Sequence, residues 1–161
     1  MYKTFMTKIL TPPLPQTLET FLMQTQEYAQ EETWQPHIVT SLDVKEDEMR
    51  RRSTSPMPSF TSPFIGKTFN EINEIFLKHI VPLDLLTNRL FIILDEQSIE
   101  SDSCLIVLGG EDFDPDDEMT FLRTDFYVAM NMVSRAEMGV TDLGENLERD
   151  QVWGVHNLAN F

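Results

Sequence analysis

The sequence predicts an α/β fold, a single domain of 161 residues in which helices flank one mixed β-sheet. Two short apolar runs near the middle of the chain, residues 90–94 and 104–108, are the strongest indication. Continuous apolar runs of this length, bounded by polar residues or glycine, are typical of strands that are buried on both faces. Segments with apolar residues at spacings of three and four indicate helices that pack on this sheet.

The first part of the chain predicts a strand, a helix and a second strand. Residues 2–10 alternate well enough for a strand, and the proline-rich run 11–15 ends it. Thr17 can cap a helix over residues 17–30, in which apolar side chains recur at three and four residues. Residues 37–44 are the next strand candidate because they contain four aliphatic side chains.

Residues 45–63 predict an exposed, mobile loop. The run begins with mixed charge and becomes rich in Ser, Thr and Pro, which is typical of connecting loops. Arg50, Arg51 and Arg52 stand directly before Ser53, and Ser55 precedes a proline. This pattern resembles a phosphorylation site or a basic docking site, although such patterns also arise by chance in loops.

A capping box predicts the next helix. Thr68 is followed three residues later by Glu71, so that each side chain can bond to the other residue's backbone N–H. Apolar residues then recur at helical spacing over residues 69–80, and Pro82 ends the pattern. We therefore expect an amphipathic helix that packs on the sheet.

The last third of the chain predicts a further strand and two helices. Residues 119–123 are expected to pair as a hairpin with the strand at 104–109. Thr124 can cap a short helix. Apolar and polar residues alternate over 132–138, which predicts an edge strand. Residues 141–148 predict a final helix.

The charge of the chain limits its partners. Twelve Lys and Arg against 27 Asp and Glu give a net charge of −15, and no Lys or Arg lies among the ten acidic residues between Asp95 and Glu118. Such a surface repels nucleic acid and anionic membranes, and it attracts a basic protein surface or a cation. The simpler interpretation is that the acidity keeps a small protein soluble.

Cysteine content and hydropathy predict a cytoplasmic, soluble protein. Cys104 is the single cysteine, so no internal disulfide can form, and its position in an apolar run predicts a packed thiol rather than a nucleophile. No run of apolar residues is long enough for a signal peptide or a membrane span.

Four motifs in the second half of the chain carry a resemblance to a known family. They are Phe91-Ile92-Ile93-Leu94-Asp95, Leu105-Ile106-Val107, the run from Asn131 to Met138, and Asp150-Gln151-Val152-Trp153. Over residues 64–161 the chain resembles an uncharacterised family of small acidic microbial proteins that is known only as a domain of unknown function. Gly139 stands where that family tends to have an acidic cap, and the loop at 45–63 is unlike it. The resemblance implies an α/β fold and, since the family has no assigned activity, no function.

The candidate site residues are Asp95, Arg123 and Asn131. Carboxylates follow both central strands: Asp95 and Glu96 come after the first, and Glu111 and Asp112 come after the second. This placement predicts an acidic rim at one edge of the sheet. Ligands of open α/β sheets favour the edge where strands end. Asp125 would join these acids there, with Arg123 as a nearby cation and Asn131 as an amide donor. Carboxylates beside apolar side chains can act as general acids or bases, but ordinary solvated acids at strand ends give the same pattern.

No metal or cofactor is predicted. Asp112, Asp114 and Asp116 alternate as in a calcium loop, but Asp117 and Arg123 stand where such a loop needs Gly and Glu. The histidines His37, His79 and His156 are too far apart in sequence for a zinc motif. Glycine motifs that cradle nucleotides, and the nucleophile motif Gly-x-Ser-x-Gly, do not occur in the sequence.

Two classes of function remain open. The first is a non-catalytic binding or regulatory protein that uses its acidic face on a basic partner. The second is a small cofactor-free enzyme of isomerase, cyclase or hydratase type, in which a small apolar ligand fills a pocket lined by Phe, Met and Ile. Asp95, Arg123 or Asn131 would carry out the acid–base chemistry of that enzyme.

Overall fold

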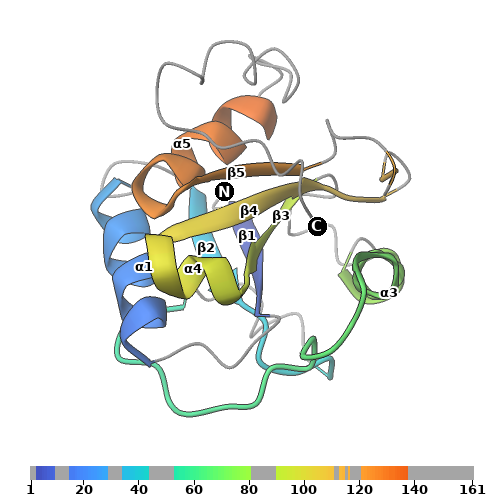
Figure 1. The fold of residues 1–161 in the computed structure, drawn as a ribbon, viewed down its shortest axis with the longest axis horizontal. Coiled ribbons are helices and arrows are strands. Elements are labelled where there is room, and N and C mark those ends of the chain that lie inside the picture. The colour runs from blue at the N-terminus through green and yellow to red at the C-terminus, as the bar shows by residue number, and fades with distance from the viewer. Residues whose placement is uncertain are drawn as a thin grey trace.

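Figure 1 shows the fold in a computed structural model, which describes residues 3–9, 15–28, 34–43, 53–80, 90–110, 113–114, 116 and 121–137. Five strands form one mixed sheet in the order β2-β1-β3-β4-β5. The strands are β1 (Lys3–Ile9), β2 (Trp34–Ile38), β3 (Leu90–Leu94), β4 (Ser103–Leu108) and β5 (Phe121–Asp125). The helices are α1 (Pro15–Tyr28), α3 (Phe69–Ile75), the π-helix η2 (Phe76–Ile80), α4 (Glu96–Ser101) and α5 (Phe126–Glu137). The predicted α/β fold with a mixed sheet is confirmed.

Strand direction changes across the sheet. β1 pairs in parallel with both β2 and β3, and Ile9 lies opposite Leu94. β3 and β4 are antiparallel, as are β4 and β5, which confirms the predicted hairpin-like pairing of the last two strands. β1, β3 and β5 therefore run in the same direction and end at one edge of the sheet, which we call the carboxyl edge.

α1 and α5 cover one face of the sheet (Figure 1) and form the first core. The predicted apolar stripe of α1 is buried, with Leu18, Phe21 and Leu22 at most 6% exposed. The Phe21 and Phe126 rings meet edge to face at 5.2 Å, a favourable geometry for aromatic pairs, and this contact joins the two helices.

α3 and η2 cover the opposite face and form the second core with Phe91, Ile93, Leu105 and Val107. The predicted capping box at Thr68 is confirmed: the backbone N–H of Thr68 donates to Glu71 at 2.8 Å, and that of Glu71 donates to the Thr68 hydroxyl at 3.3 Å. The bonds that the backbone N–H and the hydroxyl of Thr68 donate to the Glu71 carboxylate lower the pKa of Glu71. The helix then continues to Ile80, as predicted, but its last turn widens into a π-helix.

Residues 132–137 are helical, so the predicted edge strand at 132–138 is wrong, with Met138 outside the described residues. The apolar side chains of α5 that face the sheet, Phe126, Ala129, Met130 and Val133, keep a spacing of three and four across this segment. That longer period decides the structure, because it buries a continuous stripe against α1 and the sheet. The short alternation within 132–138 is incidental.

Further elements differ from expectation. Thr17 lies within α1, which begins at Pro15, and Thr124 lies in β5, so neither caps a helix as predicted. The second strand is Trp34–Ile38 rather than 37–44, because Val39 leaves the strand and is fully buried in the second core. The polar connection after β3 contains a short helix, α4, which the sequence analysis does not predict. The predicted helix at 141–148 lies outside the described residues.

The described part of the predicted exposed loop, residues 53–63, is irregular and mostly exposed, but some of its side chains pack on the protein. Ser62 is buried, and Met57 and Phe60 are half-buried against the first core. The apolar side chains within the Ser/Pro-rich run gain from this burial, which holds the segment on the protein. Residues 45–52 lie outside the described part.

Among the described residues, none of the helices is long and apolar enough to cross a bilayer. The same part of the chain contains no group of three His, Cys, Asp or Glu side chains that is suited to holding a metal ion.

Gly109→Ala is expected to lower the free energy of unfolding by about 1–3 kcal/mol. A Cβ atom at Gly109 would lie 2.5 Å from Phe91 Cε1 and 3.3 Å from Phe76 Cε1, and both rings are fully buried. Urea unfolding measures the loss. In a Phe91→Leu background the same substitution should cost less, since the clashing ring is gone, and an equal cost in both backgrounds would contradict the steric explanation.

Candidate functional site

The structure brings Asp95 and Arg123 together at the carboxyl edge. Asp95 directly follows β3, and Arg123 lies in β5 opposite Leu105 of β4. Residues opposite each other in an antiparallel pair point to the same face, so Arg123 lies on the face of the second core, to which Leu105 belongs. From there its side chain crosses β4 to reach Asp95.

Arg123 is a buried cation whose charge is paired. Its Nη2 forms an ion pair with Asp95 Oδ2, and its Nη1 donates to Ser103 Oγ at 3.0 Å. The two side chains of the pair are 3% and 15% exposed, Arg123 being the more buried. Nε of Arg123 has no hydrogen-bond partner among the described residues. The guanidinium therefore depends on Asp95 for charge compensation.

The second carboxylate oxygen of Asp95 is occupied by the N-terminus of α4. Asp95 Oδ1 accepts from the backbone N–H and from the hydroxyl of Ser98, each at 3.0 Å. The Ser98 hydroxyl in turn accepts from the backbone N–H of Asp95 at 3.0 Å, and Ser98 is fully buried. Asp95 thus caps α4 and neutralises Arg123 at the same time, which makes it a structural carboxylate rather than a free base.

Asn131 lies apart from this pair. It belongs to α5, whose buried side chains form the first core, on the sheet face opposite to Arg123. Along α5 it follows Tyr127 and precedes Arg135 at intervals of four residues, and both of these are exposed. The predicted grouping of Asn131 with Asp95 and Arg123 is therefore not formed.

The single acidic rim predicted from the strand ends is wrong. β3 and β4 are antiparallel, with Leu90 opposite Leu108, so the two strands end at opposite edges of the sheet. Glu111 and Asp112, which follow β4, lie outside the described residues, but Gly110 directly before them is at the far edge from Asp95. The carboxyl edge itself carries exposed acids: Glu96, Glu100, Asp102 and Asp125.

Cys104 is fully buried, and the packed thiol predicted from the sequence is confirmed. Burial raises the pKa of this thiol far above its ordinary value. A thiol that stays protonated at neutral pH is a poor nucleophile. His37 is buried in β2 and His79 is half-buried in η2, so the two lie on different elements.

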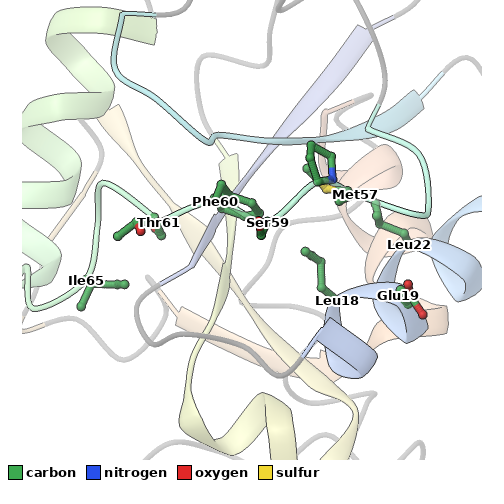
Figure 2. A pocket seen from close by; sticks show the side chains of 10 residues that line it. Leu18, Glu19, Leu22, Met57, Ser59, Phe60, Thr61 and Ile65 are labelled. Carbon is green, nitrogen blue, oxygen red and sulfur yellow. The ribbon is translucent and has the colours of Figure 1, made fainter.

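An apolar groove lies between α1 and residues 57–62 (Figure 2). Its volume is about 250 Å³. In Figure 2 the side chains of Leu18 and Leu22 stand on α1, with Met57 and Phe60 across from them and Ile65 toward the other end. The residues that line it are Leu18, Glu19, Leu22, Met57, Pro58, Ser59, Phe60, Thr61, Ser62 and Ile65.

The groove was not predicted from the sequence, because the composition of residues 57–62 is typical of an exposed loop. The signal was the presence of Met57 and Phe60 within a run that is otherwise Ser, Thr and Pro. Glu19 is the one acidic residue that lines the groove, and it is exposed. The arrangement can therefore take an apolar group and attract a positive charge beside it.

No family model, no curated protein and no solved structure matches this chain. The resemblance to a family of small acidic proteins over residues 64–161 stays a prediction. The function has to be argued from the groove and from the carboxyl edge.

Proposed function

We propose that this protein is a non-catalytic binding or regulatory protein whose groove receives an apolar side chain from a basic segment of a partner protein. The observation that carries the proposal is the groove of about 250 Å³ lined by Leu18, Leu22, Met57 and Phe60, with Glu19 as its acidic residue. A cationic residue next to the apolar anchor would be attracted by Glu19 and by the net charge of −15. A cytoplasmic location, inferred from the sequence, belongs to the same proposal.

The bonding of the carboxyl edge favours binding over the cofactor-free enzyme. Both oxygens of Asp95 are engaged, and Arg123 is 3% exposed. A general base needs a free lone pair within reach of a substrate proton. The residues that line the groove include no His, Cys, Lys or Arg, so the groove holds only the exposed Glu19 for acid–base work.

The size of the groove favours a side chain over a small-molecule substrate. Ligand pockets commonly enclose about 300–1,000 Å³ and bury most of the ligand. The groove, at about 250 Å³, is smaller. One or two apolar side chains of a peptide would fill it, while the rest of that peptide would lie outside the groove, beside the exposed Glu19.

Selection of a random peptide library on the full-length protein tests the proposal. Enriched peptides should combine an apolar anchor with Lys or Arg, and a labelled consensus peptide should then bind in fluorescence anisotropy. Ile65→Asp, at a groove residue that is 40% exposed, should weaken binding about tenfold, equivalent to about 1.4 kcal/mol. Glu19→Lys should also weaken binding, and this effect of charge should shrink at high salt.

Met23→Asp is the matched control. Met23 stands on α1 like Leu22, is 64% exposed and does not line the groove, so the same apolar-to-acidic change should leave affinity unchanged. Thermal melts verify that all variants fold. Equal loss of affinity in Ile65→Asp and Met23→Asp, or no loss in either, would rule out the groove as the binding site.

A further inference from the structure

Ser53 holds the irregular segment that follows it on the rest of the fold through three hydrogen bonds. Its backbone N–H donates to the Pro36 carbonyl at 3.2 Å, and its hydroxyl oxygen accepts from the backbone N–H of Ile38 at 2.8 Å. Its own carbonyl accepts from the Gln26 side chain at 3.2 Å. Ser53 thereby joins β2 and α1, which are separate in sequence from it.

The segment that begins at Ser53 forms one wall of the groove. We call residues 53–65 the strap. Met57 and Phe60 of the strap pack against the first core and face Leu18 and Leu22 across the groove (Figure 2). At its other end Phe64 is fully buried in the second core. Both ends of the strap are therefore held on the protein. Hydrogen bonds of Ser53 hold the first end, and burial of Phe64 holds the second.

The sequence around Ser53 has the character of a kinase substrate. Arg50, Arg51 and Arg52 precede it directly, and cationic residues before the acceptor are recognised by protein kinases with acidic substrate grooves. Ser53 is half-buried, while its neighbours Thr54 and Ser55 are exposed. Because the strap has no helix or strand, local opening that exposes Ser53 costs less than global unfolding.

We propose that Ser53 is a phosphorylation site, and that its modification releases the strap from β2 and removes one wall of the groove. In the transfer, Ser53 Oγ forms a bond to the γ-phosphorus of ATP, the bond from that phosphorus to the β-phosphate oxygen breaks, and ADP leaves. The hydroxyl proton passes to the catalytic base of the kinase. The effect on partner binding rests on the function proposed above, whereas the site and the release do not.

The bonds at Ser53 give the physical reason for release. A phosphoryl group adds a charge of about −1.5 to −2 and three oxygens to a hydroxyl that now accepts a backbone N–H at close range. That N–H belongs to Ile38, which is 2% exposed, so the new charge would be held against an apolar surface.

Phosphorylation in vitro tests the site. The full-length protein is incubated with ATP and a Ser/Thr kinase that prefers basic substrates, and the phosphate is located by fragmentation mass spectrometry. Ser53 is expected to carry it in the wild type and in the Thr54→Ala and Ser55→Ala variants, and Ser53→Ala should take up none. Phosphate on Thr54 or Ser55 but not on Ser53 would overturn the assignment.

Hydrogen exchange tests the release without any ligand. In the phosphorylated protein the Ile38 amide should exchange at least tenfold faster, while the Ile92 amide in the central strand β3 should be unchanged. Slow exchange at Ile38 after stoichiometric phosphorylation would overturn the release.

The consensus peptide of the groove then separates this inference from the proposed function. Its affinity should fall about tenfold on phosphorylation. Fast exchange at Ile38 with unchanged peptide affinity would support the Ser53 switch and contradict the groove as the binding site.

Discussion

Asp95→Ala is expected to lower the free energy of unfolding by about 3–5 kcal/mol, because it leaves the buried guanidinium of Arg123 without its carboxylate. Arg123 is only 3% exposed, so water cannot replace the lost partner. The substitution also removes the N-cap of α4, which by itself contributes about 0.5–2 kcal/mol. Urea unfolding followed by circular dichroism measures the combined loss.

Two controls separate the ion pair from the cap. Asp102→Asn changes an exposed carboxylate at the other end of α4, where asparagine tolerates the left-handed backbone, and should stay within about 0.5 kcal/mol of wild type. The double variant Asp95→Asn/Arg123→Met should recover much of the loss, since it removes both charges and the unpartnered Nε. A loss of no more than about 1 kcal/mol in Asp95→Ala would mean that Asp95 acts only as a cap.

The elements of the fold could be predicted where their signals are local. The apolar run of β3, the buried stripe of α1 and the capping box at Thr68 each depend on residues within one or two helical turns or one strand, and all three are confirmed. α4 also had a local signal, because Asp95 and Ser98 have capping-box spacing with the residue types reversed. In the usual capping box Ser or Thr comes first and the acidic residue or Gln follows, so the reversed order does not match that pattern.

The candidate site could be predicted only in part, because its geometry depends on strand direction. An apolar run does not indicate whether its strand lies parallel or antiparallel to a neighbouring strand. The antiparallel pairing of β3 and β4, which separates Asp95 from Gly110, can therefore not be predicted from the sequence. Asp95 and Arg123 are 28 residues apart, and their pairing follows from the order of three strands. The groove likewise joins α1 to a segment that composition alone assigns to a loop.

Asn73→Ala is expected to lower the free energy of unfolding by about 1–3 kcal/mol, because it leaves the buried N–H of Gly110 unpaired and removes one of the two bonds to the Gly110 carbonyl, which also accepts from the Phe113 N–H. The Asn73 side chain donates to the Gly110 carbonyl at 3.0 Å and accepts from the Gly110 N–H at 2.8 Å. This pair of bonds fastens α3 to the end of β4, across 37 residues of sequence. Asn73 is 8% exposed, so water has little access to the N–H left behind.

Asn70→Ala is the matched control for this substitution. Asn70 lies in the same helix but is exposed, so its replacement should change stability by no more than about 0.5 kcal/mol. Hydrogen exchange gives a local measurement: the Gly110 amide should lose its protection in Asn73→Ala and keep it in Asn70→Ala. If the Gly110 amide still exchanged slowly in Asn73→Ala, a different group would have to satisfy it. The second core would then be fastened to β4 by packing of Phe76 and Phe91, whose rings lie 5.1 Å apart, rather than by this amide.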